Sequence, residues 1–80
     1  MKNTSLDKIV QLENFIQSYG HEFQSISNEI KIYLLNDGEI HIIVSDYIEI
    51  YTYDISGIDN KYSSKNTEDA KNILKQFLIF

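Results

Sequence analysis

The middle of the chain alternates between apolar and polar residues with a period of two, and this pattern constrains the fold more than any other feature. Three stretches show the alternation, over residues 29–35, 39–44 and 47–53. Successive side chains of a β-strand point to opposite faces of a sheet, so each stretch is expected to form a strand with one buried face. Residues 23–26 are expected to form a fourth, weaker strand.

Short turn sequences separate these predicted strands. Asn36-Asp37-Gly38 lies between the first two alternating stretches, and an Asp-Gly pair suits the positive backbone angles of a tight hairpin. Ser45-Asp46 separates the next two stretches, and Ser27-Asn28 follows the weaker strand. Because such short connections join antiparallel neighbours, the sequence predicts an antiparallel meander.

A helix is expected on each side of the strands. Apolar residues recur at helical spacing over residues 5–19, and Gly20 then suits the left-handed conformation that often ends a helix. The polar stretch 56–65 is expected to be a loop. After it, Asn66 or Thr67 can cap a second helix, because their side-chain oxygens can bond free amide groups of the first turn.

The 80 residues are expected to form one α+β domain, 1–80, because a chain of this length supports a single hydrophobic core. The expected architecture is a two-layer sandwich in the order helix, three (or four) antiparallel strands, helix, with both helices on one sheet face. The buried face is expected to carry Ile30, Ile32, Leu34, Ile40, Ile42, Val44, Ile48, Ile50 and Thr52. The opposite face is expected to carry Lys31, Tyr33, Leu35, His41, Ile43, Tyr47, Glu49, Tyr51 and Tyr53.

Basic residues are missing from the middle of the chain. Between Ile32 and Asn60 there is no Lys or Arg, while the same stretch holds six acidic residues and four tyrosines. The whole chain has seven Lys, no Arg and a net charge of -5. A surface of one sign that also carries aromatic side chains is suited to a basic protein partner. Direct binding to nucleic acid is not expected, because Arg is the usual bidentate ligand of phosphate and guanine.

The sequence carries no recognisable catalytic or cofactor motif. There is no Cys, and the two histidines, His21 and His41, are too few for a zinc site. The three Gly are far apart, so no phosphate-binding loop is expected, and no Ser lies in a nucleophile-elbow motif. We therefore expect no enzyme activity, no cofactor and no metal. Neither a membrane-spanning stretch nor a signal peptide is expected, which favours a cytoplasmic location.

In element order, acidity and its Asn-Asp-Gly hairpin, the chain resembles certain phage-encoded inhibitors, among them some proteins that block Cas9, and some toxin-immunity proteins. The resemblance implies an inhibitor that occupies a basic site on a nuclease, a toxin or another nucleic-acid-handling protein. The element order is also similar to that of the double-stranded-RNA-binding domain. That family binds RNA through lysines at the start of its last helix, where this chain has the acidic stretch 66–70, so RNA binding is not expected.

Nine residues form the predicted partner-binding site. They are Tyr33, Asp37, Glu39, Asp46, Tyr47, Glu49, Tyr51, Tyr53 and Asp54. The acidic side chains would stand where phosphates normally bind, and the tyrosines would provide buried contact area. Two alternatives stay open. The amphipathic sheet face or a free edge strand could join two copies of the chain in a self-associating structural or accessory domain, and the tyrosines could reflect strand propensity alone.

Overall fold

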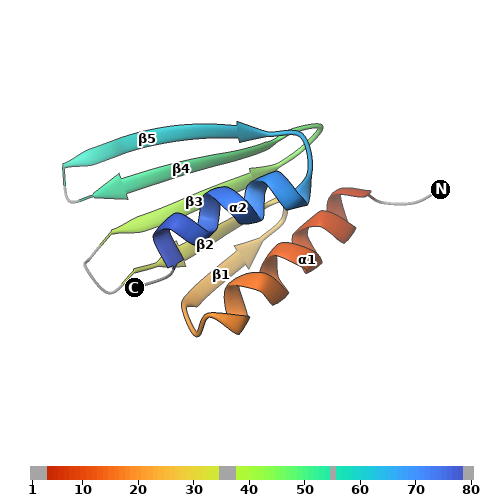
Figure 1. Cartoon of the computed structure of the whole chain (residues 1–80), viewed down its shortest axis with the longest axis horizontal. Helices are drawn as coiled ribbons and strands as arrows, with labels where there is room; N and C mark the ends of the chain where they lie inside the picture. The colour runs from red at the N-terminus through yellow and green to blue at the C-terminus, as the bar shows by residue number, and fades with distance from the viewer. Residues whose placement is uncertain (1–3, 35–37, 55, 79–80) are drawn as a thin grey trace.

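The structure is a computed structural model that describes residues 4–34, 38–54 and 56–78. Its elements follow the order helix, five strands, helix (Figure 1). They are α1 (Thr4–Ser18), β1 (Glu22–Ile26), β2 (Glu29–Tyr33), β3 (Glu39–Val44), β4 (Ile48–Asp54), β5 (Gly57–Ser64) and α2 (Thr67–Leu78). The α+β class expected from the sequence is confirmed.

The strands form one antiparallel sheet in which each strand pairs with its neighbours along the chain, in the order β1-β2-β3-β4-β5. The predicted meander is therefore confirmed. The register places Ile32 opposite Ile40 and Ile42 opposite Ile50, so apolar side chains meet across the strands. Such cross-strand pairs are the main stabilising contacts within a sheet.

The number of strands differs from the expected three or four, because the loop expected over residues 56–65 is wrong. Residues Gly57–Ser64 form β5, which pairs with β4 at one edge of the sheet. An edge strand with a solvated side needs few apolar residues, so its polar sequence concealed it. Tyr62 anchors this strand, with its ring centroid 5.9 Å from that of Phe77 in α2.

The hydrophobic core joins both helices to the sheet. In Figure 1, α2 passes in front of the strands and α1 runs alongside β1. The core consists of Ile9, Leu12 and Ile16 of α1, Ala70, Leu74 and Leu78 of α2, and Ile30, Ile32, Ile40, Ile42, Val44, Ile48 and Ile50 of the strands. All nine residues predicted to face the core lie there: eight are buried and Leu34 is partly buried against the cluster.

Local signals mark the helix ends as expected. Gly20 follows α1 with a φ of 81°, and its amide donates to the Gln17 carbonyl at 3.0 Å. Before α2, the side-chain oxygen of Asn66 accepts a hydrogen bond from the Asp69 amide at 2.8 Å. Both caps use backbone groups that the helices leave unpaired at their ends.

The turns between strands also follow the sequence signals. Ile26 pairs with Glu29, so Ser27 and Asn28 form a two-residue turn between β1 and β2. The predicted turn residues Asn36 and Asp37 lie outside the described residues. On either side of them, the Leu34 amide donates to the Gly38 carbonyl at 2.9 Å and closes the connection between β2 and β3.

Candidate binding face

We call the sheet face that alternates with the core positions the open face, since its residues point away from the buried cluster that the strands share with residues of the two helices. Strand register assigns its residues in groups, one from each strand. They are Glu22, Gln24 and Ile26 of β1, Glu29, Lys31 and Tyr33 of β2, Glu39, His41 and Ile43 of β3, Glu49, Tyr51 and Tyr53 of β4, and Lys61 and Ser63 of β5.

Five of the nine predicted site residues meet on the open face. They are Tyr33, Glu39, Glu49, Tyr51 and Tyr53. Asp46 and Tyr47 lie in the exposed turn before β4, and Asp54 ends β4, so these residues stand at opposite ends of that strand. Asp37 lies outside the described residues. The open face thus brings five of the predicted residues together, whereas Asp46, Tyr47 and Asp54 lie away from them at the two ends of β4.

His41 lies between two carboxylates at the centre of the open face. Its Nε2 is 2.9 Å from Oε1 of Glu39, and its Nδ1 is 3.6 Å from Oε2 of Glu29. The ring also stacks on Tyr53, with centroids 4.3 Å apart. The His41 side chain is 19% exposed, against 43% for Glu29 and 42% for Glu39, so the ring is covered while the carboxylates reach solvent.

Tyr51 forms a second group of paired side chains next to this one. Its hydroxyl donates to Oε1 of Glu49 at 2.9 Å, and Nζ of Lys61 lies 5.5 Å from its ring centroid. The pKa of Tyr51 is raised above its ordinary value, first by the hydrogen bond to Glu49, then by burial and by the negative charge of that carboxylate; Lys61 opposes the change. The hydroxyl therefore remains a donor at neutral pH and orients the Glu49 carboxylate.

The strand region is acidic even though the sheet brings lysines onto the open face. Residues 22–64 contain eight Asp and Glu and two Lys, a net charge of -6, and the rest of the chain carries +1. The two lysines are Lys31 and Lys61, which flank the basic-free stretch in the sequence and stand beside it in the sheet. The face is therefore a mixed surface with an excess of negative charge.

Lys61 and Glu29 are among the members of this face that the sequence reasoning missed. Lys61 was assigned to a loop, because β5 lacks a clear apolar alternation. Glu29 was not included in the site, although it has the same parity as Lys31 and so shares its face. The parity was a usable signal for Glu29, whereas the position of Lys61 over Tyr51 depends on the pairing of β4 with β5.

Asp54 has a local structural role. Its Oδ1 accepts hydrogen bonds from the hydroxyl and the amide of Ser56, at 2.7 and 2.8 Å. These bonds, the hydroxyl first, hold the pKa of Asp54 below its ordinary value. A carboxylate that bonds the backbone two residues on is typical of a turn, so Asp54 organises the connection between β4 and β5.

The turns at the other end of β4 present exposed apolar groups. Asn28 joins two of these turns, because its carbonyl accepts from the Val44 amide at 2.9 Å and its side-chain amide donates to the Val44 carbonyl at 3.1 Å. Beside this link, the exposed fraction is 66% for Ile26 and 51% for Tyr47. This end of the sheet therefore extends the open face with apolar contact area.

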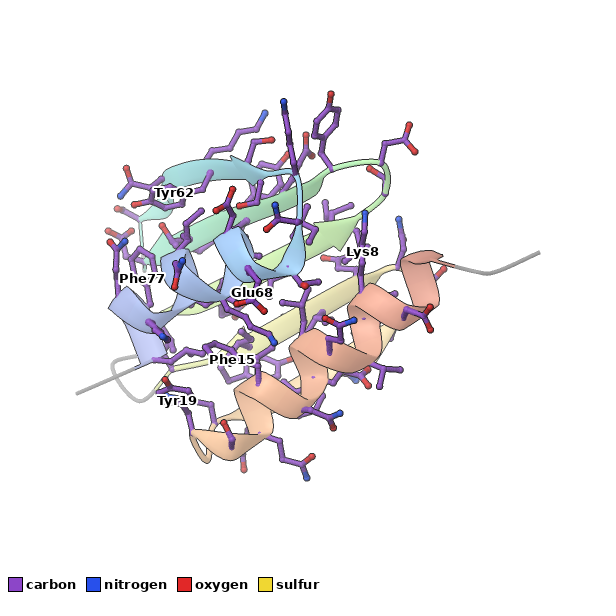
Figure 2. The ribbon with its side chains drawn as sticks, turned by 45° about the vertical axis from the view of Figure 1, so that its right-hand side comes forward. Lys8, Phe15, Tyr19, Tyr62, Glu68 and Phe77 are labelled. Carbon is purple, nitrogen blue, oxygen red and sulfur yellow. The ribbon has the colours of Figure 1, made fainter. Side chains whose placement is uncertain are left out.

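Aromatic residues on the helix side pack within the protein. Figure 2 shows Phe15 and Tyr19 on α1, Phe77 on α2 and Tyr62 on β5. The Phe15 and Tyr19 ring centroids are 5.1 Å apart, and all four side chains are partly buried against the core. These aromatic residues have a packing role, in contrast to the tyrosines of the open face.

A widely open hollow of about 510 Å³ lies beside β1 and is lined by Gln17, His21, Glu22, Phe23, Gln24 and Tyr33. No group of three or more His, Asp or Glu side chains within the described ranges is placed to hold a metal ion. Neither helix of the described chain combines the length and the apolar character that a membrane crossing requires.

Comparison with protein-family models, with curated proteins and with solved structures finds no match to this chain. Function is therefore inferred from the residues of the open face and their geometry.

Proposed function

We propose that the chain is a small acidic protein-binding module whose open face binds a basic surface of a partner protein in the cytoplasm. The observation that carries this proposal is the orientation of its carboxylates. Glu39 accepts a hydrogen bond from the His41 ring and Glu49 accepts one from the Tyr51 hydroxyl, at 2.9 Å in both cases. The neighbouring side chains of Tyr51 and Tyr53 are half-buried. Groups that are oriented before binding lose less side-chain entropy when a partner arrives.

The mechanism that we propose is competitive inhibition by phosphate mimicry. The carboxylates would occupy a site that normally binds phosphates, on a nuclease, a toxin or another nucleic-acid-handling protein, as in phage-encoded inhibitors and immunity proteins. Tyr33, Tyr51 and Tyr53 would supply most of the affinity, because tyrosine buries a large area at low entropic cost. The two lysines would set the register by repelling misplaced basic groups.

A pull-down with matched charge variants tests this function. The tagged protein is incubated with a bacterial lysate and washed with rising salt, and the bound proteins are identified by mass spectrometry. We expect a basic nucleic-acid-binding protein whose capture is lost in the double variant Glu39→Gln with Glu49→Gln, and which free nucleic acid displaces.

The matched control is Asp7→Asn with Glu68→Gln, which removes the same charge from exposed positions on the two helices. We expect this variant to retain the partner. Equal loss of the partner from both double variants, or displacement by salt but never by nucleic acid, would contradict the proposed mechanism.

Self-association is the second candidate, and the free edge of the sheet favours it. Among the strands of the described residues β1 pairs only with β2, and Ile26 at its end is 66% exposed. An uncovered edge strand can pair with a second copy of itself. Molecular mass in solution distinguishes the candidates: a dimer between acidic faces tightens as salt rises, whereas a complex with a basic partner loosens.

A further inference from the structure

We infer that Glu29 and His41 form a proton-controlled cation site on the open face, where a proton on His41 and an ammonium or guanidinium group of the partner compete for the Glu29 carboxylate. This inference rests on the proposed function, since it names the partner group that the face binds and the way pH regulates its binding.

In the neutral ring, the hydrogen-bond geometry decides which nitrogen carries the proton. Nε2 lies 2.9 Å from Oε1 of Glu39, and an ionised carboxylate only accepts, so the proton is on Nε2. Nδ1 then carries a lone pair that faces Oε2 of Glu29 at 3.6 Å. Two acceptors face each other across this gap, so the neutral ring gives the Glu29 carboxylate no hydrogen bond.

A second proton on the His41 ring turns this repulsive contact with Glu29 into an attractive one. The imidazolium ring donates from both nitrogens, so Nδ1–H then points at Glu29 and the ring bridges β2 and β3. Histidine is the side chain whose charge normally changes between pH 5 and 8. When the ring is neutral, Glu29 is available to bind a partner cation, and when the ring is protonated, His41 supplies a competing cation from within the protein.

The partner can reach Glu29 more easily than it can reach His41. The Glu29 side chain is 43% exposed, while His41 is 19% exposed beneath its neighbours. Glu29 also lines a hollow of about 110 Å³ with Gln24, Ile26 and Lys31. The alkyl part of a basic side chain can lie against the exposed Ile26 while its charged end meets Glu29, as long basic side chains commonly do on apolar surfaces.

Charged and titratable groups face His41 from each neighbouring strand. They are Glu39 on β3 itself, Glu29 and Lys31 on β2, and Glu49, Tyr51 and Tyr53 on β4. The carboxylates attract an imidazolium ring and Lys31, which is paired directly with His41, repels it. The stacked ring of Tyr53 accommodates either form, because the face of an aromatic ring also attracts cations.

The first measurement uses the free protein. NMR follows the His41 ring and the side-chain carboxyl carbon of Glu29 while the pH is lowered from about 8 to about 5, the range in which histidine titrates. We expect the two signals to change with one shared midpoint, and the Glu29 change to disappear in His41→Gln. A Glu29 signal that responds identically with and without His41 would overturn the proton part of the inference.

The second measurement uses a decalysine peptide as the cation, at low ionic strength. We expect its affinity to be about threefold to fivefold weaker at pH 5.5 than at pH 7.5, the size of one exposed ion pair, and to be independent of pH in His41→Gln. Glu29→Gln should weaken binding at pH 7.5 and also remove the pH dependence. Glu22→Gln removes the same charge from the same face, away from His41, and should keep the pH dependence.

Different results would contradict the competition at Glu29 and the binding of a basic partner. If His41→Gln keeps the full pH dependence of decalysine binding, the competition at Glu29 is wrong while the basic-partner function stands. If decalysine binds at neither pH although the NMR signals of His41 and Glu29 titrate together, the basic-partner function itself is wrong, and with it the role of Glu29 as a cation site.

Discussion

At the scale of single residues, the acidic groups of the open face differ in how they are held. Glu39 is oriented by His41 and Glu49 by Tyr51, whereas the Asp54 carboxylate accepts a hydrogen bond from Ser56 in the turn that follows β4. An oriented carboxylate has already lost part of its rotamer freedom in the folded protein, so binding costs it less. The groups that the sequence presented as one acidic set therefore divide into binding candidates and a structural residue.

Ser27 carries the clearest local strain and gives a prediction at this scale. It has a φ of 57° at the first position of the two-residue turn between β1 and β2, a position that glycine favours. Left-handed backbone costs a non-glycine residue about 1 kcal/mol. We expect Ser27→Gly to raise the free energy of unfolding by about 0.5–1 kcal/mol, measured by urea denaturation.

Ser25→Gly is the matched control, because Ser25 lies in β1 two residues earlier. Glycine within a strand adds conformational freedom to the unfolded chain without relieving strain, so this variant should lower the free energy of unfolding by about 0.5–1 kcal/mol. A decrease in both variants would show that the Ser27 backbone is not strained.

At the scale of elements, β5 decides the composition of the open face. The strand brings Lys61 over Tyr51 and covers the edge of β4, yet it carries few apolar residues. Its attachment therefore depends on backbone pairing with β4 and on the contact of Tyr62 with Phe77 in α2. A strand held in this way is only weakly stabilised against detachment from the sheet, since one side chain supplies much of its packing.

We expect Tyr62→Ala to lower the free energy of unfolding by about 2 kcal/mol, because it removes a half-buried ring and its aromatic contact. Ser63→Ala is the control in the same strand: Ser63 is exposed and lies on the open face, so its effect should stay within about 0.5 kcal/mol. Urea denaturation measures both variants. Equally small effects would mean that β5 does not depend on the helix layer.

At the scale of the whole molecule, the charge is divided between two parts. Residues 22–64 carry -6 and the remaining residues carry +1. Like charges concentrated in one small sheet repel one another, and this repulsion opposes the folded state. The same excess of negative charge speeds encounter with a basic partner, so the region that favours binding also reduces stability.

Salt should therefore stabilise the free protein. Raising NaCl from about 0.01 M to about 1 M shortens the screening length from roughly 30 Å to roughly 3 Å. We expect the urea midpoint to rise, with an unchanged dependence on urea, by an amount equivalent to roughly 1 kcal/mol. The double variant Glu39→Gln with Glu49→Gln should show a smaller rise than Asp7→Asn with Glu68→Gln. A midpoint that falls with salt would mean that attractive pairs such as Glu68 with Lys71 outweigh the repulsion.

The sequence alone was sufficient for the features that depend on neighbouring residues. Period-two alternation predicted the three central strands and their core face, and Gly20 and Asn66 marked the helix ends, because each of these signals is local in the chain. The tyrosines and carboxylates of the open face were likewise predictable from parity, since parity fixes the side of a strand. The five site residues on that face are the strand residues with the open-face parity, whereas Asp54 ends β4 and bonds the following turn.

Only the tertiary structure decided how these side chains meet. The Glu29–His41–Glu39 contacts require the register of β2 with β3, and the position of Lys61 over Tyr51 requires a fifth strand that the sequence did not signal. Both depend on residues distant in sequence, whose pairing follows from the best burial of the whole core. The physical reason is that a strand's own pattern sets which way its side chains point, whereas the neighbours that they meet are set by the packing of the entire sheet.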